Sequence, residues 1–322
     1  MAARFLERLK QGSILGDGGY VLELERRCLG SYKTHIPMAV LDHPEGVLEL
    51  SREFAIAGSE VLQAMTWGVK EFDREAELNR TAVRVAREAA GPDRFVAGTL
   101  TAPPGGYHSV RQGGTLTDHD RQQLETFYAR RIEQQMSVGV DLFMLESAYS
   151  VEMAIPAIRP MRAAGVPAVI LMTFRESPYT LENYSAAEGA KRLEDAGADV
   201  VGLNCNRPFQ TMLPLMREIR RAVSVPLCSQ PVAYQLEPGE ISSQGLTNPG
   251  LWTRIEPRLL TRFHYAEYAL EAHRIGIDFI GACCGTLPYH VRAMAEALGK
   301  PTAMPDMDRG YQRDSEWRTR GI

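Results

Sequence analysis

The strongest constraint on the fold is an alternation of short apolar runs with longer amphipathic segments, repeated along the chain. Each apolar run has the length of a buried strand, roughly four to eight residues. The runs occupy residues 13–16, 60–65, 95–100, 141–146, 168–174, 200–205, 225–230 and 279–283. A turn residue or a polar segment follows each run, so every run can end as a separate strand.

The segments between the runs have the period of a helix. Apolar residues recur every three or four positions in 121–138, 211–223 and 265–275. Alternating strands and helices in this number predict an α/β protein, a single-domain (β/α)8 TIM barrel. An open doubly wound sheet has the same periodicity and is the alternative. No glycine-rich dinucleotide fingerprint follows the first run, which counts modestly against that alternative.

Composition excludes several classes of function. The net charge of −4 comes with no basic patch, so we expect no nucleic-acid partner. No apolar run reaches the roughly 18 residues of a membrane span. The chain has five cysteines, and an odd count predicts a reducing, cytoplasmic location. We expect residues 1–300 to form the barrel and residues 301–322 a polar C-terminal extension.

Three cysteines occupy the ends of two predicted strands. Cys205 ends the sixth run, and Cys283 and Cys284 end the eighth. The C-terminal strand ends of a barrel form its active site, so the three sulfurs could meet around one Zn²⁺ and leave a fourth position for a substrate thiol. Buried cysteines also serve as small apolar side chains, and spacing alone does not decide. We prefer that second interpretation for Cys28 and Cys228.

Two acidic residues also stand at predicted strand ends. Asp17 and Gly18 follow the first run, where the backbone can approach a ligand closely or simply turn. Glu146 ends the fourth run inside an apolar stretch, where a carboxylate needs a partner. That partner could be a substrate ammonium group or an arginine at the barrel rim such as Arg175.

Aromatic residues near the expected barrel mouth could form a cage for a quaternary ammonium or sulfonium group. For each residue taken alone, ordinary packing is the more common role. They are Tyr20, Trp67, Tyr107, Tyr149 and Trp252.

Several motifs resemble the zinc-dependent homocysteine S-methyltransferases, and the betaine-dependent branch most of all. The matching segments are 17–19, 43–45, 57–59, 202–205, 229–234, 256–258, 281–285 and 288–290. The resemblance covers about residues 12–298 and implies a barrel with zinc on Cys205, Cys283 and Cys284. It also implies that Asp17, Gly18 and Glu146 hold the amino-acid end of homocysteine. Asn204, inside the Gly-Leu-Asn-Cys motif, is a further predicted substrate-binding residue.

Three positions differ from the betaine-binding pattern. Ser147 replaces a tyrosine, Trp67-Gly68 replaces an aromatic pair, and His35 replaces a tryptophan. Tyr149 could substitute for one missing ring. We therefore expect an onium donor that is not necessarily glycine betaine.

The predicted function is a zinc-dependent transfer of a methyl group from a betaine-like or sulfonium donor to L-homocysteine, giving methionine. Both substrates are small molecules. The sequence leaves open the identity of the donor and whether the protein is a homo-oligomer. The alternatives are a cobalamin-linked methyltransferase module that needs a partner and a non-catalytic zinc-binding barrel.

Overall fold

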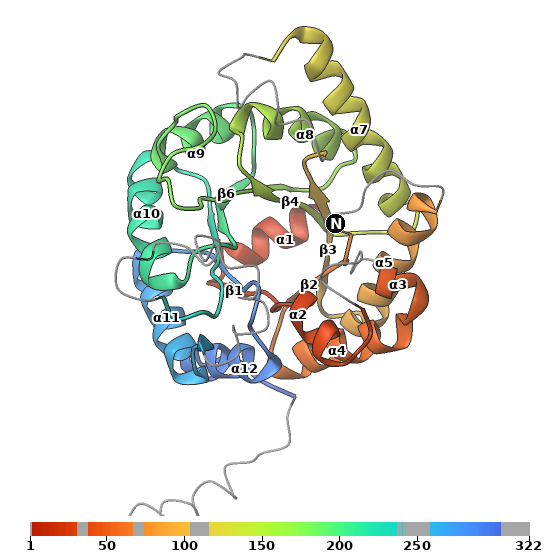
Figure 1. Ribbon diagram of the computed structural model, residues 1–322, viewed down its shortest axis with the longest axis vertical. Helices are drawn as coiled ribbons and strands as arrows, with labels where there is room; N and C mark the ends of the chain where they lie inside the picture. The colour runs from red at the N-terminus through yellow and green to blue at the C-terminus, as the bar shows by residue number, and fades with distance from the viewer. Residues whose placement is uncertain are drawn as a thin grey trace, which may run out of the picture.

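Eight parallel strands form one sheet that curls into a nearly closed barrel (Figure 1). The computed structural model describes residues 2–30, 38–66, 74–103, 116–236, 240 and 258–303. The strands are β1 (Ile14–Leu15), β2 (Val61–Gln63), β3 (Phe95–Thr101), β4 (Leu142–Ala148), β5 (Ala168–Met172), β6 (Val200–Asn204), β7 (Leu227–Gln230) and β8 (Phe279–Ile280). The prediction of a (β/α)8 barrel is confirmed, and the open doubly wound alternative is wrong.

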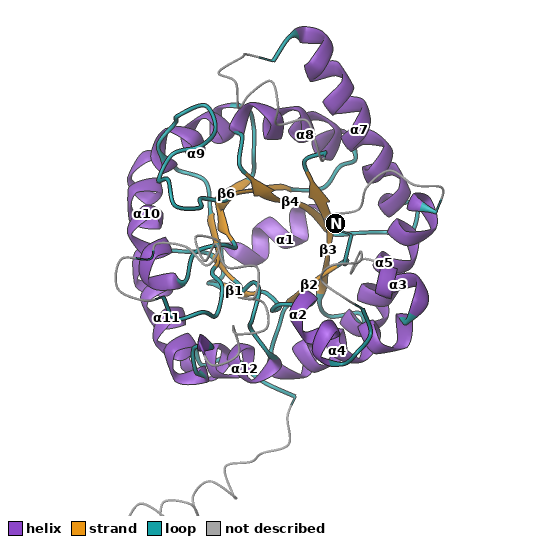
Figure 2. Ribbon diagram, viewed as in Figure 1, coloured by secondary structure: helices purple, strands orange, loops and turns teal. Residues whose placement is uncertain are grey.

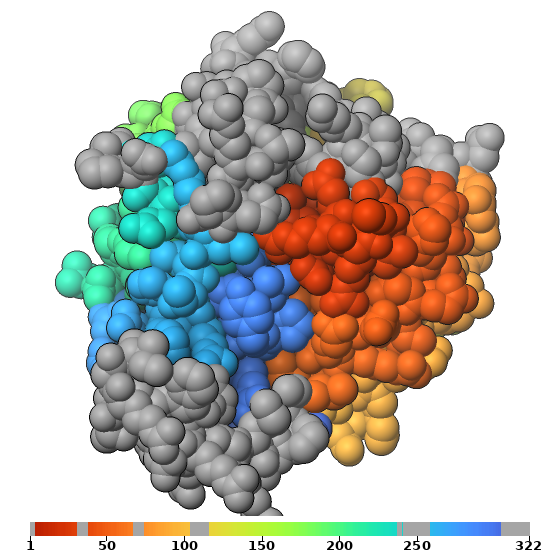
Figure 3. Space-filling view, turned by 60° about the horizontal axis from the view of Figure 1, so that its bottom comes forward, coloured from red at the N-terminus to blue at the C-terminus, as the bar shows by residue number. Residues whose placement is uncertain are grey.

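The barrel closes where the first strand meets the last. Strand β1 pairs with β8 in parallel, with Ile14 opposite Phe279. Next to β2, the backbone N–H of Glu60 donates to the carbonyl of Leu15 at 2.7 Å. Figure 3 shows the N-terminal segments in red and orange directly against the C-terminal segments in blue. The first and last strands are therefore neighbours at the mouth of the barrel.

Most of the described helices surround the strands as an outer ring (Figure 2). They are α2 (Val21–Arg26), α3 (Ala39–Asp42), α4 (Pro44–Ala57), α5 (Glu75–Ala90), α7 (Asp118–Met136), α8 (Val151–Ala163), α9 (Ala186–Asp195), α10 (Phe209–Ala222), α11 (Arg262–Ile275) and α12 (Pro288–Ala297). Helices α4 and α11 end at Gly58 and Gly276, whose φ angles of 114° and 84° suit a left-handed cap. The predicted helical segments thus have counterparts in α7, α10 and α11.

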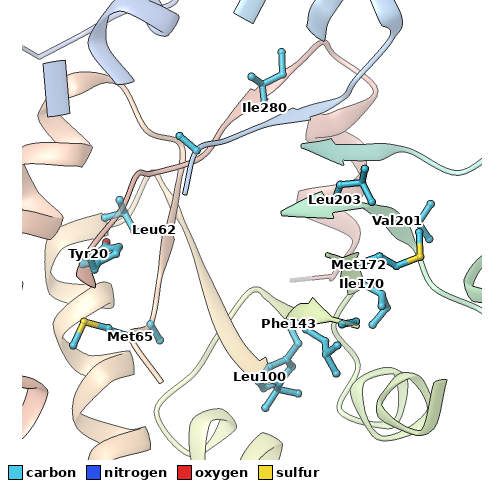
Figure 4. Close-up of a cluster of buried hydrophobic side chains, with 14 of the residues drawn as sticks. Tyr20, Leu62, Met65, Leu100, Phe143, Ile170, Met172, Val201, Leu203 and Ile280 are labelled. Carbon is cyan, nitrogen blue, oxygen red and sulfur yellow. The ribbon is translucent and has the colours of Figure 1, made fainter. Parts of the chain in front are cut away.

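Side chains of each strand alternate between two apolar layers. One layer lies between the strands and the helices and includes Leu62, Phe143 and Ile170 (Figure 4). The other fills the barrel interior and includes Val61 and Leu142, the neighbours of the outward-facing residues. Adjacent strand residues point to opposite faces, so short, wholly apolar runs are what a barrel strand buried on both faces requires.

An N-terminal helix closes one end of the barrel. Helix α1 (Ala2–Leu9) places Phe5 and Leu9 in the interior apolar cluster. The Phe5 ring meets Phe95 and Phe279 edge-on, with ring centroids 5.5 and 6.1 Å apart. Both partners begin their strands, so α1 covers the N-terminal end. The C-terminal strand ends face the other way and are left for a site.

Most strand boundaries differ from the predicted runs by one or two residues, and two of the differences have a clear cause or consequence. Strand β7 begins at Leu227 rather than Val225 because Pro226 has no N–H to donate. Strand β8 ends at Ile280, so Cys283 and Cys284 lie in the following turn. The apolar run continues past the strand because Gly281 and Ala282 are also buried.

Several predictions fall outside the described residues. These concern His35, Trp67, Gly68, Tyr107, Trp252 and the predicted extension from residue 304 onward. Among the described helices, none is both long and apolar enough to cross a membrane.

Candidate active site

The sulfur atoms of Cys205, Cys283 and Cys284 form one cluster at the C-terminal end of the barrel. All three lie within 4.8 Å of one another. The Cys205 Sγ is 3.8 Å from the Cys284 Sγ, and the sulfurs of Cys283 and Cys284 are 3.9 Å apart. The cluster joins the ends of β6 and β8 and could hold a metal ion.

The segment after β7 holds the two cysteine segments together. The N–H of Cys205 donates to the carbonyl of Gln230 at 2.9 Å, and that of Cys283 donates to Pro231 at 2.9 Å. The Ala233 N–H donates to the carbonyl of Cys284, also at 2.9 Å. Because β7 lies between β6 and β8, its continuation aligns both sets of sulfurs.

Left-handed backbone turns Cys205 out of the strand. Cys205 and Asn206 have φ angles of 59° and 57°. Non-glycine residues adopt such angles rarely, because they strain the backbone, and they are found most often at functional sites. On the other side, Gly285 has a φ of 83°, and a Cβ there would lie 2.7 Å from the Tyr234 ring. Tyr234 belongs, with Leu22 and Val232, to a small apolar cluster against which the three cysteines pack. Only glycine lets this ring approach the turn so closely.

The three thiols shift one another's pKa values in opposite directions. Hydrogen bonds from Cys283 and Cys284 hold the pKa of the Cys205 thiol well below its usual range. The pKa values of Cys283 and Cys284 are raised, first by their hydrogen bonds with Cys205 and then by burial. A lowered pKa favours the thiolate form of Cys205, and a thiolate in this partly buried cluster would attract a cation.

A cavity of about 270 Å³ opens in front of the sulfurs. Its lining includes predicted site residues from four strand ends, namely Gly18, Glu146, Asn204, Cys205, Cys283 and Cys284. Gln63 and Ser147 also line it, and the sequence did not single out Gln63. The one sequence feature that could have pointed to Gln63 is that it is polar within the apolar run 60–65. That feature is weak, because polar residues at the rim of a barrel are common.

Two buried carboxyl groups lie at this end of the barrel. Desolvation raises the pKa of Asp17 to about 7 and that of Glu146 to about 8. One oxygen of Asp17 accepts from the Gln63 N–H and the Tyr20 hydroxyl, each at 2.8 Å. Within the described residues the other oxygen, Oδ1, is buried without a hydrogen bond. Such groups suit a cationic ligand, since a nearby positive charge would favour their ionised forms.

Asn204, at the end of β6, contacts the end of β4, which lies on the other side of β5 in the sheet. Its side-chain Oδ1 accepts from the Ser147 N–H at 2.9 Å. Ser147 has a φ of 56°, and the register between β4 and β5 shifts there. The amide of Asn204 therefore stabilises a bend after Glu146.

Two interpretations offered by the sequence are not found in the part of the chain that the structure describes: an ion pair of Glu146 with Arg175, and Cys28 as a buried apolar side chain. The described structure has no ion pair between Glu146 and Arg175; the Arg175 guanidinium stacks on the Tyr149 ring, 4.7 Å from its centroid. Cys228 is buried in the barrel interior, but Cys28 is exposed beyond α2, so its interpretation as a buried apolar side chain was wrong. A helix-like pattern does not reveal that the helix stops at Arg26.

Comparison with known proteins agrees with this architecture. A family model described as homocysteine S-methyltransferase matches residues 14–298. Mouse (Mus musculus) betaine–homocysteine S-methyltransferase 1 is 35% identical over 313 residues, covering 91% of this chain and 74% of that protein. The S-methylmethionine–homocysteine S-methyltransferase BHMT2 of Pongo abelii is 33% identical, covering 91% and 80%.

A solved structure shares the fold. The homocysteine methyltransferase MmuM from Escherichia coli, in its metallated form, superposes with a TM-score of 0.69 at 19% identity. The match covers 92% of this chain and 99% of that one. Fold and motifs together define a methyltransferase barrel. The chain belongs to the homocysteine S-methyltransferase family.

Proposed function

We propose that this protein transfers a methyl group from an onium donor to the sulfur of L-homocysteine, with Zn²⁺ bound by Cys205, Cys283 and Cys284. The observation that carries the proposal is the convergence of three sulfurs beside a cavity lined by Glu146 and Asn204. Membership of the family supports the reaction type.

The sulfur spacing fits zinc. With Zn–S bonds of about 2.3 Å in tetrahedral geometry, ligand sulfurs lie about 3.8 Å apart. The two measured separations are 3.8 and 3.9 Å. When bound, zinc would lower the pKa of the substrate thiol and keep it as the nucleophilic thiolate at neutral pH.

The acidic groups suit the amino-acid end of homocysteine. Asp17 and Glu146 are buried, and desolvation raises the pKa of each. The substrate ammonium would supply the missing positive partner. Gly18 lines the cavity beside them, and a Cβ there would lie only 2.6 Å from the Phe54 ring, so the packing requires glycine at this position.

The remaining residues of the site contribute orientation and exclusion of water. The homocysteine sulfur forms a bond to the donor methyl carbon, and the bond from that carbon to the cationic nitrogen or sulfur breaks with its electron pair. The products are methionine and the demethylated, neutralised donor. No proton transfer to the donor is required, so alignment of the reactants is the main contribution of the protein.

The two branches named among the relatives use different donors, so the identity of the donor remains part of the proposal. Ser147 and Gly68 stand where the betaine-dependent branch is expected to carry rings, so the donor is not necessarily glycine betaine. We also propose the boundary at residue 300 between barrel and extension, and a cytoplasmic location that keeps the five free cysteines reduced.

The test is a donor screen with the purified, zinc-loaded protein. Homocysteine is combined in turn with glycine betaine, dimethylsulfonioacetate and S-methylmethionine, and methionine is measured by mass spectrometry. At least one donor should give turnover without any added protein. Turnover only with a corrinoid protein would favour the cobalamin-linked alternative, and zinc binding without turnover would favour the non-catalytic one.

A further inference from the structure

Arg175 is placed at the mouth of the barrel without an acidic partner. It follows β5 and is exposed, and the described residues contain no ion pair that includes it. Its guanidinium stacks on the Tyr149 ring and donates to the Tyr149 hydroxyl at 3.3 Å. This arrangement fixes the plane of the guanidinium but leaves most of its N–H groups available.

The loop that carries Arg175 is anchored on both sides of it. Arg207 is buried, and its guanidinium donates to the carbonyls of Phe174 and Glu176 at 3.2 and 3.4 Å. Further along, the Leu181 N–H donates to the carbonyl of Tyr149 at 2.9 Å. The backbone flanking Arg175 is therefore held before any ligand arrives, which reduces the entropic cost of binding.

The same group connects to the cysteine cluster. The Asn206 side-chain amide donates to the Tyr149 hydroxyl at 3.0 Å and to Thr173 Oγ1 at 3.2 Å. Asn206 directly follows Cys205. Tyr149 thus links Arg175 to the strand end that carries one of the three sulfurs.

At this end of the barrel, acidic groups lie at the strand ends and a positive charge lies on the loop after β5. Glu146 and the cysteine cluster line the cavity at the strand ends, whereas Arg175 lies outside that lining and provides a positive charge on the loop after β5. A donor carrying only a positive charge would be repelled by Arg175. A zwitterion can place its onium group toward the sulfurs and its carboxylate toward the guanidinium.

The stacking also changes the role expected for Tyr149. One face of its ring is covered by the guanidinium, so that face cannot enclose an onium group. Tyr149 is instead a support for Arg175.

We propose that Arg175 binds the carboxylate of the methyl donor, so that the donor is a zwitterionic onium acid. This inference rests on the proposed function, because it concerns the second substrate of the same reaction. Arginine suits the role since its planar fork pairs with both oxygens of a carboxylate.

The experiment compares steady-state kinetics of the zinc-loaded wild type and Arg175→Met. Methionine keeps an unbranched apolar stem against Tyr149 and removes the charge. Each onium acid that supports turnover is assayed beside its methyl ester, which keeps the onium group and removes the negative charge. The matched control is Arg192→Met, because Arg192 also stacks on a tyrosine, 4.0 Å from the Tyr184 centroid, but lies on α9 and pairs with Glu188.

The expected result for Arg175→Met is a KM for the acid donor about 10- to 100-fold higher, with the homocysteine KM unchanged. The wild type should prefer the acid to its ester, and Arg175→Met should lose that preference. Arg192→Met should behave as wild type. Arg175→Lys, which keeps the charge without the fork, should recover part of the loss.

Other outcomes would overturn the inference. An unchanged donor KM in Arg175→Met would reject it while leaving the proposed function intact. A raised homocysteine KM with an unchanged donor KM would assign Arg175 to the other substrate. A wild type that makes no methionine from any onium donor would reject both proposals.

Discussion

His290 should make the stability of the protein depend on pH in a defined window. The imidazole is fully buried between α12 and the segment before α11. Its Nδ1 accepts the Leu287 N–H at 2.9 Å, and its Nε2 lies 2.7 Å from the Leu260 carbonyl and so donates to it. These two bonds use both ring nitrogens of a neutral imidazole. A second proton would have to sit on Nδ1, facing the N–H of Leu287.

The size of the effect follows from the pKa. Burial lowers the pKa of His290 from 6.5 to about 4. Below pH 6.5 His290 binds a proton in the unfolded chain but stays neutral in the folded protein. The free energy of unfolding therefore decreases as the pH falls toward 4. Linkage gives a loss of about 2 kcal/mol between pH 7.5 and pH 5, and a limit of about 3.4 kcal/mol below pH 4.

The assay is urea unfolding at pH 7.5 and pH 5 under reducing conditions, for wild type and His290→Asn. Asparagine can still accept the Leu287 N–H but does not titrate. Wild type should lose about 2 kcal/mol more than the variant between the two pH values. Other titrating groups are common to both proteins, so they cancel in this difference.

His264→Asn is the matched control. His264 has the same position in α11, where its Nδ1 accepts the Thr261 N–H at 3.1 Å, but this contact is exposed. This variant should keep the pH dependence of wild type. If His290→Asn also kept it, the account of a buried neutral imidazole would be wrong.

Three further predictions concern the site and its frame. Cys284→Ala should lose bound zinc, measured by elemental analysis, together with turnover, while Cys228→Ala keeps both; full activity in metal-free Cys284→Ala would reject the role of the cluster. Asp17→Asn, which can still accept from the Gln63 N–H, should raise the homocysteine KM about 10- to 100-fold and leave the donor KM alone; equal KM values would remove Asp17 from the site. Gly202→Ala should fail to give folded protein in a thermal melt, because its Cβ would lie 1.7 Å from the Cys228 carbonyl oxygen; a normal melting temperature would contradict the β6–β7 contact.

The barrel was predictable because most strand residues are apolar, whichever face of the sheet they occupy. Runs such as 95–100 and 168–174 are bounded by polar turns, and the structure places β3 and β5 within one or two residues of them. Boundaries at turns were less predictable, as β8 shows. Its apolar run continues beyond Ile280 into a buried turn, and composition cannot distinguish the two.

Part of the candidate site was also predictable, because the thiols and carboxyl groups stand at strand ends. The roles of Arg175 and Arg207 were not. Each depends on where a loop folds back. Between Glu146 and Tyr149 the backbone also bends at Ser147, whose φ angle is 56°. A backbone bend of this kind leaves no mark on hydrophobic periodicity.

The position of β8 between β1 and β7 has a consequence for biosynthesis. A nascent chain that has emerged from the ribosome as far as Cys205 presents only one of the three sulfurs. The other two arrive almost eighty residues later, with the strand that seals the barrel. Any ion that needs all three sulfurs can therefore be acquired only after Cys284 has been synthesised and the last strand has docked.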